Sequence, residues 1–83
     1  MDHYFFTARS VTHAQQMARA LEQAGIGAKM RRAGAGLSDR GCAYVLEISA
    51  KSYLRARRQL MEKRLRPVRV FVQEGGTLRE VLP

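Results

Sequence analysis

The residue best suited to chemistry is Cys42, the one cysteine in this sequence of 83 residues. A thiolate is a strong nucleophile, and neighbouring positive charge or the start of a helix lowers the pKa of a cysteine thiol. Arg40 lies two residues before Cys42, while Ser10 and His13 lie where a helix is predicted to begin. We therefore expect Cys42 to be a reactive thiol that Ser10, His13 and Arg40 tune.

A structural role for Cys42 is the alternative. The cysteine has the same strand parity as Tyr44 and Leu46, so it also fits as the first small apolar residue of the core. A metal site is not expected, because His3 and His13 stand at no ligand spacing from the cysteine. We expect no metal and no cofactor.

The composition predicts one globular domain over residues 1–83. Apolar residues make up 46% of the chain, which is ordinary for a folded protein of this size. The sequence has neither an apolar run long enough to span a membrane nor the layout of a signal peptide. A single cysteine forms no internal disulfide, as is usual in a reducing compartment, so we expect a cytoplasmic protein without a membrane association.

Apolar residues at alternate or helical spacing predict six elements and a tail. They are a strand at 3–8, a helix from about 11 to 24 with Ser10 as its N-cap and Gly25 at its end, strands at 26–32 and 43–48, a helix at about 50–65, a strand at 68–73, and a short tail at 75–83 that forms at most one helical turn. Met30 of the second strand and Met61 of the second helix are predicted to face the core.

This order of elements predicts an α+β fold of the ferredoxin-like βαββαβ type. Right-handed crossovers give a four-stranded antiparallel sheet in the order 4-1-3-2 with both helices on one face. Residues 3–74 form the core of the domain and 75–83 lie outside it. The other face of such a sheet can remain open to solvent. The residues predicted on this open face are Phe5, Lys29, Arg31, Val45, Arg69 and Phe71.

Positive charge is concentrated around the second helix. The chain has a net charge of +8, and residues 51–69 hold eight basic side chains against one acid, Glu62. A solvated helix face would explain this pattern, and so would a docking surface for an acidic partner. The partner-binding residues that we predict here are Lys51, Arg55, Arg58, Lys63 and Arg64.

Residues 40–45 also permit a nucleic-acid hypothesis. Their sequence, Arg-Gly-Cys-Ala-Tyr-Val, resembles the strand signature of RNA-recognition motifs, in which aromatic side chains stack on bases. Cys42 replaces the first stacking aromatic of that signature, while Phe5 and Phe71 remain available on the open face. Nucleic-acid binding is therefore an alternative function.

Over most of its length the chain resembles the small selenium/sulfur carrier-like family. The resemblance rests on Tyr-Phe-Phe-Thr at 4–7, on Ala-Gly-Ile at 24–26, and on a loop with Ser38 that leads to Cys42. It implies that Cys42 carries sulfur or selenium as a persulfide or selenopersulfide, and that donor and acceptor proteins are the partners. The chain is also similar to small PII-like signalling domains, which share Ala-Gly-Ile and need no cysteine.

These observations lead us to expect a thiol-dependent carrier or accessory protein rather than an enzyme, because no nucleophile and base stand at a convincing spacing. The alternatives are an RNA- or DNA-binding domain that uses the open face and the basic helix, and a PII-like interaction module. In the latter case Phe5, Val45 and Phe71 would form a homodimer interface.

Overall fold

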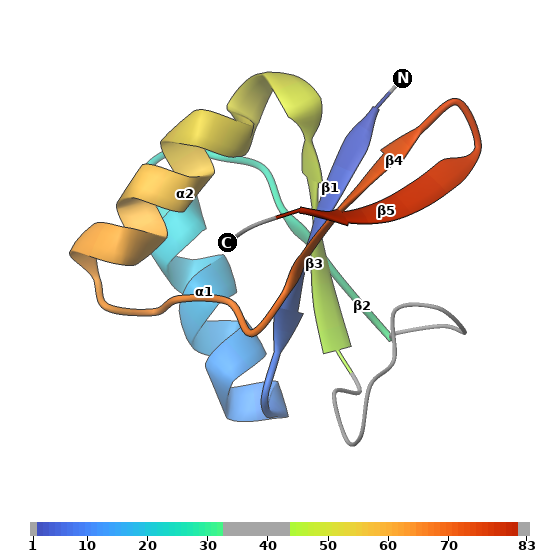
Figure 1. Ribbon diagram of the computed structural model, residues 1–83. Coiled ribbons are helices and arrows are strands. Elements are labelled where there is room, and N and C mark those ends of the chain that lie inside the picture. The colour runs from blue at the N-terminus through green and yellow to red at the C-terminus, as the bar shows by residue number, and fades with distance from the viewer. Residues whose placement is uncertain (1, 33–43, 82–83) are drawn as a thin grey trace.

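A computed structural model describes residues 2–32 and 44–81 of the chain. The elements are β1 (His3–Ala8), α1 (Val11–Gln23), β2 (Lys29–Arg32), β3 (Tyr44–Ser49), the 3₁₀ helix η1 (Ala50–Ser52), α2 (Tyr53–Glu62), β4 (Val70–Glu74) and β5 (Thr77–Val81). All neighbouring strands are antiparallel, and they form one sheet in the order β2-β3-β1-β4-β5. Both helices lie on the same side of this sheet (Figure 1). The predicted α+β class is confirmed.

The core lies between the sheet and the two helices. Alternate residues of β1 face the helices, and Phe6 stands opposite Leu46 of β3 and Val70 of β4. Met17 and Leu21 of α1 and Ala56 and Leu60 of α2 complete this fully buried cluster. Tyr53 stacks on Tyr4, with ring centroids 3.9 Å apart, and so fixes the start of α2 against β1.

Helix α1 follows its local sequence signals closely. The Ser10 side chain accepts a hydrogen bond of 3.0 Å from the N–H of His13, which satisfies one of the free donors of the first turn. The helix ends at Gly25, whose φ of +73° lets the N–H of Ile26 donate to the Leu21 carbonyl. The predicted N-cap and terminating glycine are both confirmed.

The prediction of four strands is wrong, because part of the expected tail forms the edge strand β5. Gly75 and Gly76 have φ values of +54° and +88°, and Glu74 pairs with Thr77 across them. This is a two-residue hairpin loop, a turn that glycines favour because both central residues need positive φ. The predicted order of the first four strands holds, but β4 is an interior strand rather than an edge strand.

Two methionines predicted to face the core are exposed. Met30 lies on the edge strand β2, all of whose residues are exposed. The side chain of Met61 is 58% exposed, and Leu65, which follows α2, packs against the core instead.

Strand β2 begins at Lys29 rather than at Ile26, and β4 begins at Val70 rather than at Val68. The second helix is shorter than predicted, since residues 50–52 form the separate 3₁₀ turn.

Candidate functional site

The segment that carries Cys42 joins β3 at a defined place in the sheet. Cys42 and Arg40 themselves lie outside the described residues. Tyr44, the first residue of β3, pairs with Ala8 at the end of β1 and with Arg32 at the end of β2. The chain therefore enters β3 at the end of the sheet where β1 ends and α1 begins, as the topology predicted.

Of the residues predicted to tune the thiol, His13 is buried in the fold. Its side chain is 2% exposed, and its Nδ1 accepts a hydrogen bond of 3.1 Å from the backbone N–H of Arg9. This bond requires an unprotonated Nδ1, so the neutral ring carries its proton on Nε2. The Nε2 atom is buried without a hydrogen-bond partner among the described residues. Ser10 caps the same helical turn.

Burial lowers the pKa of the His13 imidazole, because the charged form loses its hydration. The positive charge of Arg9 lowers the pKa further, while the backbone of Arg66 and Leu65 acts in the opposite direction. His13 is therefore neutral in the folded protein near pH 7. The ring contacts both the β1–α1 junction and the segment after α2, so it holds these two segments together.

The basic residues predicted for partner binding lie in different local environments around α2. Arg55 donates a hydrogen bond of 3.2 Å to the Ala24 carbonyl at the end of α1. Arg58 is exposed on the outer side of α2, and Lys51 is exposed in η1. Lys63 and Arg64 follow α2 and line two different hollows. The structure thus divides these cations among several places around the second helix.

The outer side of α2 carries two exposed apolar residues among these cations. Leu54 is 72% exposed, and it lines a hollow of about 520 Å³ together with Met61, Arg57, Arg58 and Glu62. Leu54, Arg58 and Met61 lie one helical turn apart on one face, and the arginine charge sits beside the apolar atoms. Leu54 was not among the predicted site residues; its regular spacing from Met61 was the available signal.

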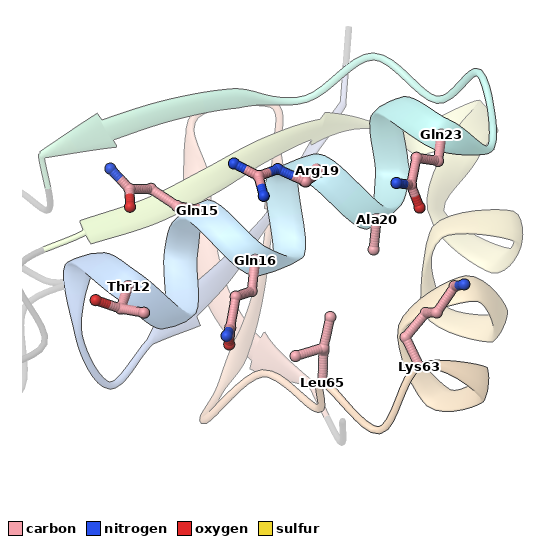
Figure 2. Close-up of a pocket in the computed structure, with 8 residues that line it drawn as sticks. All are labelled: Thr12, Gln15, Gln16, Arg19, Ala20, Gln23, Lys63 and Leu65. Atoms are coloured by element: carbon pink, nitrogen blue, oxygen red, sulfur yellow. The ribbon is translucent and has the colours of Figure 1, made fainter.

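A groove between the two helices was also not predicted. It has a volume of about 440 Å³ and lies between α1 and the segment that follows α2 (Figure 2). The residues that line it are Thr12, Gln15, Gln16, Arg19, Ala20, Gln23, Lys63 and Leu65. Only the fold reveals this groove, because the chain after α2 and the face of α1 that it passes are distant in the sequence.

The open face carries its apolar residues in a buried cluster. Phe5, Val45 and Phe71 contact one another on neighbouring strands and are 7%, 1% and 8% exposed. Aromatic rings this deeply buried present little surface for base stacking or for a second copy of the chain. Among the described residues, these three side chains therefore do not form an exposed apolar patch on the open face.

Charged side chains surround this cluster. Glu47 bonds to Arg31 at 2.6 Å and lies 3.1 Å from His3 Nδ1, and Arg69 lies 3.8 Å from the Glu80 carboxylate. Lys29 is exposed on the same edge as Arg31. Each pair is partly exposed, so its contribution to stability is small.

Two kinds of site are absent from the part of the chain that the structure describes. No group of three or more histidine, cysteine or carboxylate side chains is placed to hold a metal ion within residues 2–32 and 44–81. None of the helices described is long and apolar enough to cross a bilayer.

Comparison with known proteins identifies a family. No curated protein and no solved structure was found to match the chain. The sequence model of one family matches residues 3–71, which include β1 to α2 and the start of β4. The matched region contains Cys42 and the β1–α1 junction. The chain belongs to the family described as Putative Se/S carrier protein-like.

Proposed function

We propose that this protein is a small carrier that accepts sulfur or selenium on Cys42 and passes it to an acceptor protein. The observation that carries the proposal is the family match over residues 3–71. The sequence offers one thiol for such a role, since it has a single cysteine. No enzymatic activity is part of the proposal.

The described frame supports a stabilised thiolate at this position. Cys42 precedes Tyr44 by two residues, and two residues of extended chain span at most about 7 Å. Tyr44 pairs with Ala8, and Arg9 and the capped start of α1 follow directly. A cation and a helix N-terminus near a cysteine favour the thiolate over the thiol.

The transfer chemistry needs no external oxidant. The Cys42 thiolate attacks the outer sulfur of a donor persulfide, the sulfur–sulfur bond of the donor breaks, and the donor leaves as a thiolate. The new sulfur–sulfur bond leaves a persulfide on Cys42. An acceptor thiolate then attacks the outer sulfur of that persulfide and regenerates the Cys42 thiolate. Selenium in the outer position follows the same steps.

The outer side of α2 is the docking surface in this proposal. Leu54 and Met61 supply apolar contact area, and Arg58 beside them supplies charge for an acidic partner. A donor or acceptor protein with an acidic rim around apolar side chains would fit this surface. Exchange of sulfur with a small-molecule donor would not require it.

Mass spectrometry of the intact protein after treatment with inorganic polysulfide tests the carrier role. We expect the wild type to gain one or more sulfur atoms that a thiol reductant removes, and Cys42→Ser to gain none. The alkylation rate of Cys42 against pH should report a thiol pKa below the ordinary value of about 8.5. An ordinary or raised pKa together with a protein that stays unmodified would contradict the proposal.

A separate measurement addresses docking. Arg58→Glu should slow sulfur transfer from a persulfide-bearing enzyme and leave the reaction with polysulfide unchanged. Lys51→Glu in η1, outside the α2 hollow, is the matched control. Equal slowing by both variants would show that net charge, not this surface, governs transfer.

A further inference from the structure

Three arginines from two segments line one hollow beside the end of α2. Arg9 follows β1, and Arg64 and Arg66 follow α2; together with Met61 they enclose about 480 Å³. Among the described residues, no acidic side chain lines this hollow. Like charges that face one space repel one another, so an arrangement of this kind favours an anion between them.

The backbone at Arg64 has a conformation that is unfavourable for a residue with a side chain. Arg64 has a φ of +57°, and it is the only residue other than glycine with a positive φ in the part of the chain described. The end of α2 has the same hydrogen bonds as the end of α1: Leu65 donates to Leu60 as Ile26 donates to Leu21. Helix α1 uses Gly25 at the equivalent position. An arginine there is less favourable than a glycine, because its Cβ crowds the backbone in the left-handed region.

The segments that carry the other two arginines are tied to the core. The N–H of Arg9 donates to His13, and the Arg66 and Leu65 backbone lies against the same buried ring. Thr7 exchanges backbone hydrogen bonds with residues 68 and 69, at 2.9 Å each, and its hydroxyl accepts from the Arg69 N–H at 2.8 Å. The backbone on both sides of the hollow is therefore fixed, which reduces the entropy lost when a ligand binds.

We propose that Arg9, Arg64 and Arg66 form a binding site for a phosphate dianion, either free or as the monoester of a small organic molecule. Guanidinium groups bind phosphate oxygens through paired N–H donors, and three of them match the charge and the several acceptor oxygens of this group better than those of a carboxylate. Met61 supplies an apolar wall that an organic substituent could contact. The site does not include Cys42 and does not depend on the carrier function.

Calorimetric titration with inorganic phosphate and with phenyl phosphate tests the site, at a pH at which both are dianions; the second pKa is about 6 for a phosphate monoester and higher for inorganic phosphate. We expect saturable binding with one site per chain. Tighter binding of phenyl phosphate would identify a monoester as the ligand, and equal binding would identify free phosphate. Amide chemical shifts should change most at Arg9 and Arg66.

Arg64→Gly is the decisive variant, because it removes the side chain and relieves the backbone at the same time. We expect it to weaken phosphate binding about tenfold or more, the size of one lost charged hydrogen bond. The same variant should unfold at a higher urea concentration than the wild type. Loss of binding could then not be attributed to loss of the fold.

Lys51→Ala is the matched control, since it removes one cation from η1, at the start of α2 rather than at its end, and changes the net charge equally. Its phosphate affinity should stay within about twofold of the wild type, because Lys51 does not line the hollow and an exposed charge is screened by salt. The proposal is overturned if Lys51→Ala and Arg64→Gly weaken binding equally, or if the wild type does not bind phosphate saturably. Binding of a thymidine oligonucleotide that phosphate does not displace, with no saturable phosphate binding, would also overturn it.

Discussion

Removing the His13 imidazole should destabilise the protein in a way that depends on pH. The ring is 2% exposed and bonds to the Arg9 N–H at 3.1 Å. His13→Ala leaves a cavity and removes the acceptor of that N–H. We expect a loss of about 2–4 kcal/mol in the free energy of unfolding near pH 7, toward the lower end if water can reach the freed Arg9 amide.

The pH dependence follows from the lowered pKa of His13. Burial is the main cause, the Arg9 charge adds to it, and the Leu65 and Arg66 backbone opposes it. Between the folded pKa and the unfolded value of about 6.5, the unfolded chain binds more protons than the folded one. The stabilisation from neutral His13 is therefore complete above about pH 6.5 and is lost as the pH falls toward the folded pKa. Each unit of separation between the two pKa values corresponds to about 1.4 kcal/mol.

Urea unfolding followed by circular dichroism, from about pH 8 to about pH 5, measures this effect. His13→Asn keeps an acceptor for the Arg9 N–H but does not titrate. As the pH falls, the wild type should therefore lose more free energy of unfolding than His13→Asn does. His3→Asn is the control, because His3 is partly exposed beside Glu47 and should leave the His13 response in place. Parallel curves for the wild type and His13→Asn would refute the reasoning, as would an NMR titration of His13 with a pKa of 6.5 or above.

Two further predictions concern the fold. Gly76→Ala, at a φ of +88°, should lower the free energy of unfolding by about 1 kcal/mol. Gly27→Ala, which has open space around the added methyl, should be neutral or slightly stabilising. Urea unfolding compares the two variants, and equal effects would exclude the hairpin geometry as the cause. Leu60→Ala should lower the free energy of unfolding by about 2–5 kcal/mol, because Leu60 is fully buried. Leu54→Ala, on the exposed side of α2, should change it by no more than about 0.5 kcal/mol in the same urea measurement. A large loss for Leu54→Ala would mean that this residue packs in the fold.

Local signals in the sequence were sufficient for most of the scaffold. Ser10 and Gly25 mark the two ends of α1, and both act as predicted. Alternating apolar residues in β1 and β3 predicted the central strands and their buried face. Chirality then restricted the arrangement of the first four strands, and their predicted order is the observed one.

Strand β5 was not predicted, because it is an exposed edge strand whose apolar residues do not alternate clearly with polar ones. Only Val81 packs against the core, and the preceding residues are exposed. The Gly75-Gly76 pair was interpreted as the end of a strand, although two glycines between extended segments also favour a hairpin. Met30 and Met61 were wrongly predicted to be buried for a related reason. Spacing shows on which side of a strand or helix a residue lies. It does not show whether a neighbouring element is long enough to cover that residue.

The chemical environment of the site residues depends on contacts that are distant in sequence. His13 was predicted to tune the thiol, and its buried contact with Leu65 and Arg66 could not be inferred from either segment alone. Arg64 belonged to a basic cluster in the sequence, but its left-handed backbone and its shared hollow with Arg9 follow from the way α2 ends. Cys42 and Arg40 lie outside the described residues, so their predicted roles stay predictions.

Arg9 is the residue at which the two proposed activities meet. It follows Ala8, which pairs with the first residue of β3, and its side chain lines the arginine hollow while its N–H bonds to His13. In the proposed function, the charge of Arg9 favours a thiolate on Cys42, and a phosphate dianion in the hollow would neutralise part of that charge. We therefore expect saturating phosphate to raise the Cys42 thiol pKa, which the alkylation rate against pH, with and without phosphate, would measure. Substitution of Arg9 would disturb both activities, so Cys42→Ser and Arg64→Gly are the variants that separate them.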